Sequence, residues 1–129
     1  MTAEQWGGLD HFTSNEFTYP DKMDFGMIFR LDQARAAAGV PFFITSDWRP
    51  EGDGKSHHQG KAVDIRCGDA RTLARINFGL VDAGFRRIGW YYKEITGGNH
   101  HILGHVHADL NTADEGFDQD VSWIGVSRR

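Results

Sequence analysis

The segment KAVDIR at residues 61–66 decides how the chain is interpreted, because its apolar and polar side chains alternate. In a β-strand, successive side chains point to opposite faces, so Val63 and Ile65 share one face and Asp64 lies on the other. The apolar pair is expected to meet a core, and the carboxylate must then meet water, a ligand or a metal ion. The segment is therefore predicted to be a strand with a functional outer face.

A second segment, HVHADL at residues 105–110, has the same design. His105, His107 and Asp109 fall on one face of a predicted strand, and the residues between them are apolar. If the two strands are neighbours in one sheet, Asp64 and His107 converge. Two polar strand faces, forty residues apart in the chain, then form one site.

A third residue, outside the two strands, completes a metal-binding set. His57 lies in the polar loop that enters the first strand, so it can join Asp64 and His107. Three protein ligands and one open position are typical of a catalytic zinc ion, which accepts imidazole and carboxylate together. His105 can then reach the open position as a base, and Asp109 can hold a ligand histidine in one tautomer. Spacing alone leaves open the alternative of solvated surface histidines.

The remaining pattern predicts an α+β fold: a small central antiparallel sheet, helices packed on one side, and the zinc site on the open face. Trp90 and Tyr91 are interpreted as core or cleft wall. The chain is expected to form a single domain over residues 1–129, with a core at about 10–112 and an irregular C-terminal tail at 113–129. The predicted helices span about 21–38 and 70–83, the strands about 40–46, 61–66, 85–92 and 101–110, and a loop 47–60.

Composition narrows the function classes. The 129 residues carry a net charge of -4, which argues against a nucleic-acid-binding surface. Cys67 is the single cysteine, so no disulfide can form within the chain. The sequence has no signal-peptide pattern and no apolar run of the roughly 20 residues that a membrane span needs. We therefore expect synthesis in the cytoplasm, no membrane partner and a monomer.

The motifs carry a family resemblance. The pattern H-x-x-G-x-A-x-D at residues 57–64, followed by H-x-H at 105–107, resembles the paired metal motifs of the zinc peptidases that cut peptidoglycan peptides. This family contains D-alanyl-D-alanine carboxypeptidases, dipeptidases and many phage endolysins. It is related to lysostaphin, the murein endopeptidases and the hedgehog-type zinc folds. ITSDWRP at 44–50 and AGFRRIGWYY at 83–92 add to a resemblance that covers about residues 10–112.

The resemblance implies a role for each residue of the site. His57, Asp64 and His107 would bind Zn²⁺. His105 takes the place of the family's catalytic base, and would either move a proton or stabilise the tetrahedral intermediate. Arg49 matches an arginine that steadies the oxyanion or binds a substrate carboxylate, for which a guanidinium is suited; the alternative is an ordinary surface salt bridge.

The implied function is hydrolysis of a peptide bond in bacterial cell-wall stem peptides. The expected enzyme is a zinc metallopeptidase of the D-Ala-D-Ala carboxypeptidase or L-Ala-D-Glu endopeptidase type. Without a signal peptide or an attached wall-binding module, it is expected to be a phage endolysin or virion-associated lysin that reaches the wall after release. Two alternatives remain: a cytoplasmic D-Ala-D-Ala dipeptidase or carboxypeptidase, and a non-enzymatic, zinc-stabilised binding domain.

Overall fold

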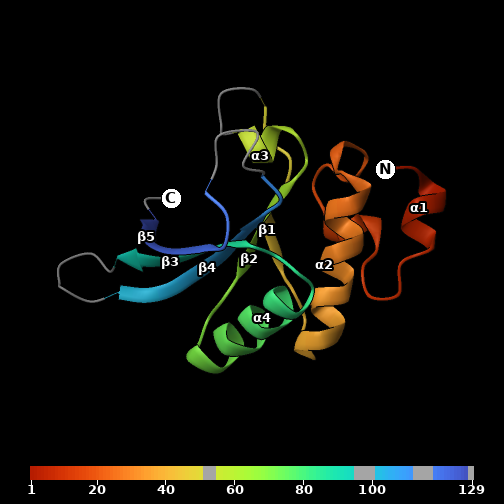
Figure 1. Ribbon diagram of the computed structural model, residues 1–129. Helices are drawn as coiled ribbons and strands as arrows, with labels where there is room; N and C mark the ends of the chain where they lie inside the picture. The colour runs from red at the N-terminus through yellow and green to blue at the C-terminus, as the bar shows by residue number, and fades with distance from the viewer. Residues whose placement is uncertain (51–54, 95–100, 112–117, 128–129) are drawn as a thin grey trace.

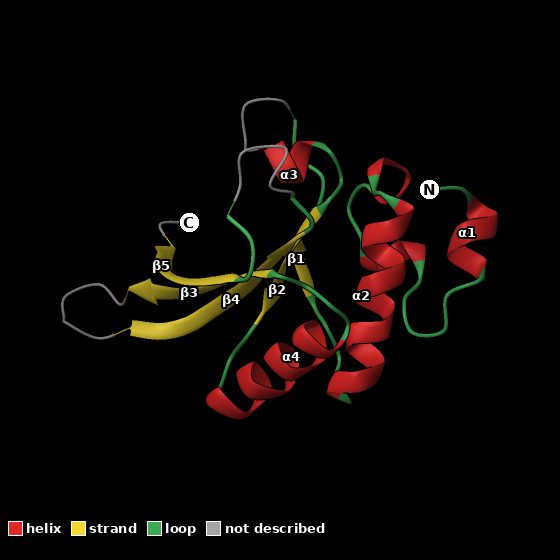
Figure 2. Ribbon diagram, in the orientation of Figure 1, coloured by secondary structure: helices red, strands yellow, loops and turns green. Residues whose placement is uncertain are grey.

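Helices and a five-stranded sheet form an α+β fold (Figures 1 and 2). The computed structural model describes residues 1–50, 55–94, 101–111 and 118–127. In chain order, its elements are α1 (Ala3–Gly7), the 3-10 turns η1 (Ser14–Glu16) and η2 (Pro20–Lys22), α2 (Phe25–Ala38), β1 (Ile44–Ser46), α3 (Lys55–His58), β2 (Ala62–Arg66), α4 (Ala70–Asp82), β3 (Arg87–Glu94), β4 (His101–Asp109) and β5 (Val121–Ser127).

The sheet is mixed, with the strand order β1-β2-β4-β3-β5. The first four strands of this order pair antiparallel, as the alternating segments predict. β5 pairs parallel with β3, so the prediction of a wholly antiparallel sheet is wrong at this edge. The two segments that decide the fold, β2 and β4, are direct neighbours in the middle of the sheet.

One face of the sheet carries the core. Val63 and Ile65 of β2 lie opposite Ala108 and Val106 of β4, and all four are fully buried. Helices α2 and α4 pack on this face, where their apolar residues join the same cluster. α1 lies beyond α2, away from the sheet (Figure 1). The polar residues that alternate with the core residues therefore point to the other face, as predicted.

The first long helix starts later than the sequence predicts. Asp21 lies in η2, and α2 begins at Phe25 because the Asp24 side chain accepts a hydrogen bond from the backbone N–H of Met27 at 3.0 Å. The predicted end is confirmed: Gly39 adopts the left-handed conformation, with φ 68°, directly after Ala38. The apolar residues that recur at helical spacing in the predicted 21–38 segment are all buried: Met23, Met27, Leu31, Ala34 and Ala38.

The other predicted elements are largely confirmed. α4 begins at Ala70 after the N-cap Asp69, whose side chain accepts from the Thr72 N–H at 2.7 Å. The predicted 40–46 strand is shorter, since only Ile44–Ser46 pairs with β2. The predicted 47–60 loop contains the short helix α3, and residues 51–54 of it lie outside the described residues.

The C-terminal segment contradicts the prediction of an irregular tail over residues 113–129. Within it, Val121–Ser127 forms β5, which pairs with β3 along its whole length. The sequence signal is weak because the apolar island of this otherwise polar segment, residues 123–126, is short. The strand is held by contacts with a distant partner: Trp123 lies against Gly89, in register across the two strands.

The two core helices meet at a glycine, which gives a stability prediction. A Cβ on Gly79 of α4 would overlap the Ala34 carbonyl oxygen and lie 2.8 Å from the Ala38 Cβ, both in α2. Gly79→Ala is therefore expected to force the helices apart and lower the free energy of unfolding by about 1–3 kcal/mol, measured by urea denaturation. Gly7→Ala is the control, because no atom lies within 4 Å of its added Cβ. Equal stability of the two variants would contradict close packing at Gly79.

No helix among the described residues has the length and the apolar character required to cross a membrane.

Candidate metal centre

The register of the central strands brings two predicted ligands together on the open face. Asp64 of β2 lies directly opposite His107 of β4. His57 comes from α3, which precedes β2, and only 5% of its surface is exposed. One potential ligand atom from each of the three residues lies within 4.8 Å of the others. This buried cluster of two imidazoles and one carboxylate could hold a metal ion.

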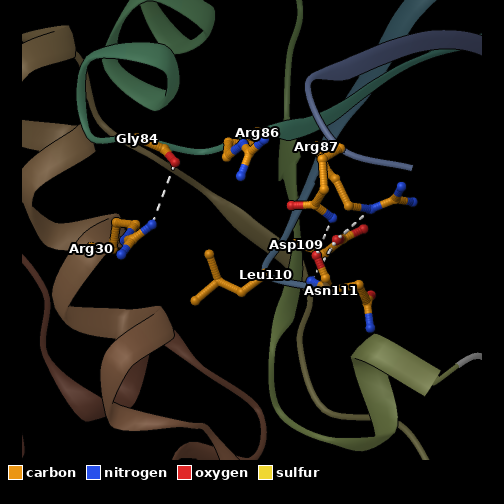
Figure 3. Close-up of a pocket in the computed structure, with 8 residues that line it drawn as sticks. Arg30, Gly84, Arg86, Arg87, Asp109, Leu110 and Asn111 are labelled. Carbon is orange, nitrogen blue, oxygen red and sulfur yellow. Dashed lines mark hydrogen bonds and ion pairs between the residues drawn. The ribbon is translucent and has the colours of Figure 1, made fainter. Parts of the chain in front are cut away.

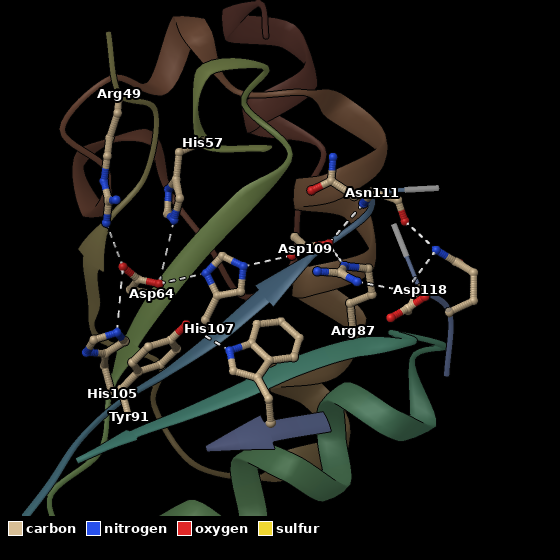
Figure 4. Close-up of polar contacts among 12 residues, drawn as sticks. Arg49, His57, Asp64, Arg87, Tyr91, His105, His107, Asp109, Asn111 and Asp118 are labelled. Atoms are coloured by element: carbon tan, nitrogen blue, oxygen red, sulfur yellow. Dashed lines mark hydrogen bonds and ion pairs between the residues drawn. The ribbon is translucent and has the colours of Figure 1, made fainter. Parts of the chain in front are cut away.

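Both histidines are held by the ring nitrogen that faces away from Asp64, and Figure 4 shows this contact for His107. The Nδ1 atom of His57 lies 2.8 Å from the backbone oxygen of Asp47, and the Nε2 atom lies 3.7 Å from Asp64 Oδ1. In His107 the roles are reversed: Nε2 lies 2.8 Å from Asp109 Oδ2, and Nδ1 lies 3.0 Å from Asp64 Oδ1. Histidines that bind metals usually donate their other N–H to a carbonyl or a carboxylate in this way. The donor set therefore fits a cation placed among His57 Nε2, His107 Nδ1 and the carboxylate of Asp64.

The charges of the cluster are tightly linked. Burial would raise the pKa of Asp64, but the hydrogen bond from His107 and the nearby imidazoles outweigh burial and lower it. Burial would lower the pKa of His107, but its bonds to Asp109 and Asp64 raise it to about 9. For His57, burial prevails and lowers the pKa. Without a metal, the protonated His107 ring therefore donates from Nδ1 to Asp64 and from Nε2 to Asp109, and a bound cation would replace the proton on Nδ1.

The metal-free protein should lose stability in alkaline solution. The pKa of His107 is raised from 6.5 to about 9 in the folded state, so its stabilising contribution is fully present below pH 6.5 and is lost as the pH rises through about 9. We expect a loss on the order of 3 kcal/mol over this range, measured by urea denaturation with a chelator present. His107→Gln, which does not titrate, is the control. If the free energy of unfolding depends on pH in the same way in the parent protein and in this variant, His107 is not the group responsible for the alkaline loss of stability.

Asp109 connects the cluster to the next strand. Its Oδ2 atom lies 2.8 Å from His107 Nε2. Its Oδ1 atom accepts hydrogen bonds from Arg87 Nε at 2.8 Å and from the Asn111 backbone N–H at 3.0 Å. Only 3% of Asp109 is exposed, and these contacts lower its pKa despite its burial. The carboxylate is therefore fixed and ionised beside the outer nitrogen of His107.

Asp109→Asn is expected to weaken zinc binding by roughly 10- to 100-fold, because the outer partner of His107 loses its charge. The stoichiometry at saturating metal should stay near one per chain, since all three ligand residues remain. Titration against a chelating dye measures both quantities. Asp120→Asn is the matched control, because Asp120 is an exposed carboxylate paired with Arg86. An Asp109 variant with the parent affinity would show that this contact does not support the site.

The structure places Arg49 and His105 at the second oxygen of Asp64. Arg49 Nη2 lies 2.8 Å from Asp64 Oδ2, and its Nε donates to Ser46 Oγ at 2.8 Å. His105 Nε2 lies 3.9 Å from the same Oδ2 atom. The side chain of Arg49 is only 17% exposed, so its ion pair belongs to the cluster and is not an ordinary surface salt bridge. His105 is close enough to serve the site without belonging to the ligand set.

Two residues next to the histidines have no motif in the sequence. Tyr91 of β3 stacks on His105, with ring centroids 4.7 Å apart, and Trp123 of β5 lies against His107 at 5.6 Å. The indole Nε1 of Trp123 donates to the Tyr91 hydroxyl at 2.8 Å (Figure 4). Tyr91 was predictable only as core or cleft wall, and Trp123 only as part of an apolar island. The edge strand β5 thus contributes directly to the surroundings of the cluster.

A pocket borders the outer side of this arrangement. It has a volume of about 300 Å³, and its lining includes Arg87 and Asp109 as well as Arg30 and Arg86 (Figure 3). None of the three clustered ligands lines it. The pocket therefore lies beside the support of His107 and is separate from the space enclosed by the ligands.

Comparison of the chain with protein-family models, with curated proteins and with solved structures finds no match. The case for a function therefore comes from the geometry of the site and from its motifs.

Proposed function

We propose that the chain is a zinc-dependent peptidase that hydrolyses a peptide bond in the stem peptides of bacterial peptidoglycan, as a phage endolysin or virion-associated lysin does. One observation carries the proposal: His57 and His107 each use one ring nitrogen for a supporting contact and turn the other toward the buried carboxylate of Asp64. A third histidine, His105, lies beside this carboxylate but outside the ligand set. Three ligands with a neighbouring base are typical of catalytic zinc sites. The order and spacing of the motifs favour the peptidoglycan peptidases within that class.

Zinc fits the donor set better than the harder divalent cations. Two imidazole nitrogens and one carboxylate suit its borderline-soft character, whereas magnesium and calcium prefer oxygen ligands throughout. His57, Asp64 and His107 would hold the ion. When bound, zinc would polarise the scissile carbonyl group and lower the pKa of a water molecule to about 7.

The remaining residues supply the proton transfer and the charge. His105 accepts the proton of the attacking water and passes it to the leaving amine, because its imidazole lies beside Asp64 on the open face. Arg49 steadies the negative charge that develops on the carbonyl oxygen, since its guanidinium is held at the cluster by Asp64 and Ser46. Asp109 keeps His107 oriented throughout.

The proposal is tested by mass spectrometry of peptides released from purified peptidoglycan. The zinc-loaded protein is expected to release stem-peptide fragments with one consistent cleavage site, which also identifies the bond. Removal of the metal with a chelator should stop the release, and added zinc should restore it. A protein that holds one zinc per chain and releases no peptide from either diaminopimelate-type or lysine-type walls would contradict the proposal.

A further inference from the structure

Two glycines on the open face let two aromatic rings lie across neighbouring strands. The parallel register of β3 and β5 places Gly89 beside Trp123, and Tyr91 beside Gly125. A Cβ on Gly89 would lie 2.5 Å from Trp123 Cε2, and one on Gly125 would lie 2.7 Å from Tyr91 Cε1. Real Cβ atoms do not approach ring atoms this closely, so both glycines are needed for these ring positions.

The two rings are fixed against the histidines of the site. The Tyr91 ring is nearly parallel to His105, with an interplanar angle of 8°. Trp123 lies against His107, and the guanidinium of Arg87 lies 5.1 Å from the centre of the indole ring. A residue held by stacking on one side and by a hydrogen bond at its tip has little freedom to turn.

The hydrogen bond between the two rings determines where the Tyr91 hydroxyl can donate. A phenolic hydroxyl has one proton and can accept from other donors. It accepts from Trp123 Nε1 at 2.8 Å, and among the described residues no acceptor takes its own proton. Figure 4 shows the hydroxyl between His105 and His107, on the same face as Asp64. The proton therefore remains available to a molecule bound at the cluster.

We propose that Tyr91 is a substrate-binding donor of this site, and that Trp123 is its positioning residue. The Tyr91 hydroxyl donates to the oxygen of the carbonyl group under attack, where negative charge develops, and Trp123 keeps that hydroxyl turned toward the cluster. The substrate class is a peptide carbonyl or an equivalent oxyanion. This inference rests on the proposed function, because it assigns one more contact within the same site.

The orienting bond can be tested in the metal-free protein. In ¹⁵N NMR spectra, Tyr91→Phe is expected to shift the Trp123 indole N–H resonance upfield and to speed its exchange with solvent, since the acceptor is removed. Tyr92→Phe is the matched control: Tyr92 is the next residue of β3, and no hydrogen bond of its hydroxyl is found among the described residues. An unchanged Trp123 signal in Tyr91→Phe would overturn the positioning role of Trp123.

The donor itself is tested with acetohydroxamate, whose two oxygens resemble those of a hydrated peptide bond. Titration calorimetry of the zinc-loaded protein should show roughly tenfold weaker binding for Tyr91→Phe, because one hydrogen bond to a charged oxygen is lost. On a released-peptide assay, kcat should fall by roughly 10- to 100-fold, with KM and zinc content unchanged. Trp123→Phe should lower the hydroxamate affinity and kcat as well, but by less, because the Tyr91 hydroxyl remains and is only no longer held in its orientation.

The outcomes separate this inference from the proposed function. If the parent protein cleaves peptidoglycan and Tyr91→Phe matches it in kcat and in hydroxamate affinity, the donor role is wrong while the function stands. If the parent does not cleave peptidoglycan, the proposed function fails, and the hydroxamate affinity still decides whether Tyr91 is a donor.

Discussion

Asp64→Asn is expected to lower the affinity of the protein for zinc by roughly 1,000-fold, or about 4 kcal/mol, a substantial part of the binding energy of a protein zinc site. Asp64 supplies the single carboxylate of the ligand set and lies within 3.0 Å of His107 Nδ1 and 3.7 Å of His57 Nε2. An amide of the same shape has no charge, and its nitrogen cannot bind the ion. Metal analysis and competition with a chelating dye measure the loss.

The controls for this variant must separate metal loss from unfolding. Asp64 also pairs with Arg49, so its replacement leaves a part-buried guanidinium without its counter-charge. Circular dichroism should show that the variant keeps its fold before its metal content is compared. His58→Ala serves as the matched change, because His58 adjoins His57 in α3 but is exposed and outside the ligand set. Parent-like zinc affinity in a folded Asp64→Asn protein would exclude this cluster as the metal centre.

The central half of the site was predictable because its signal is local. Alternation within β2 and β4 assigns each side chain to a face, and the face of Val63 and Ile65 fixes that of Asp64. A one-residue shift of either strand would bury its polar residues in the core, so Asp64 and the polar residues of β4 share one face once the strands are neighbours. A two-residue shift would keep the faces, so the exact pairing of Asp64 with His107 comes from the register of the structure.

The other half depends on contacts that no short motif encodes. β5 pairs parallel with β3, and its place at the edge depends on Trp123 fitting over Gly89, more than thirty residues earlier. The support of His57 comes from the backbone oxygen of Asp47, and a backbone atom leaves no side-chain pattern. The start of α2 was misplaced because Asp21 and Asp24 are equally good caps in sequence, and only the bond to Met27 distinguishes them.

His105→Ala is expected to reduce peptide release from peptidoglycan by roughly 10²- to 10⁴-fold while the protein retains its zinc. The reason is the position of the side chain: His105 Nε2 is 3.9 Å from Asp64 Oδ2, near the cluster, but it is not among the three residues whose ligand atoms converge. Its removal takes away the proton acceptor and leaves the ligands in place. Initial rates of release and metal analysis of the same sample are the two measurements required.

Three results would have different meanings for His105. Loss of zinc together with activity would make His105 a ligand, contrary to the geometry. Full activity would exclude it as the base and favour a domain that uses zinc only for stability or for binding a partner. Loss of activity with zinc retained would support the enzyme, and comparison with Asp64→Asn, which should lose both, would then distinguish proton transfer from metal binding. His105 lies 3.9 Å from an oxygen of Asp64, so the two variants change adjacent side chains. A difference in zinc content between them would therefore separate proton transfer from metal binding within one site.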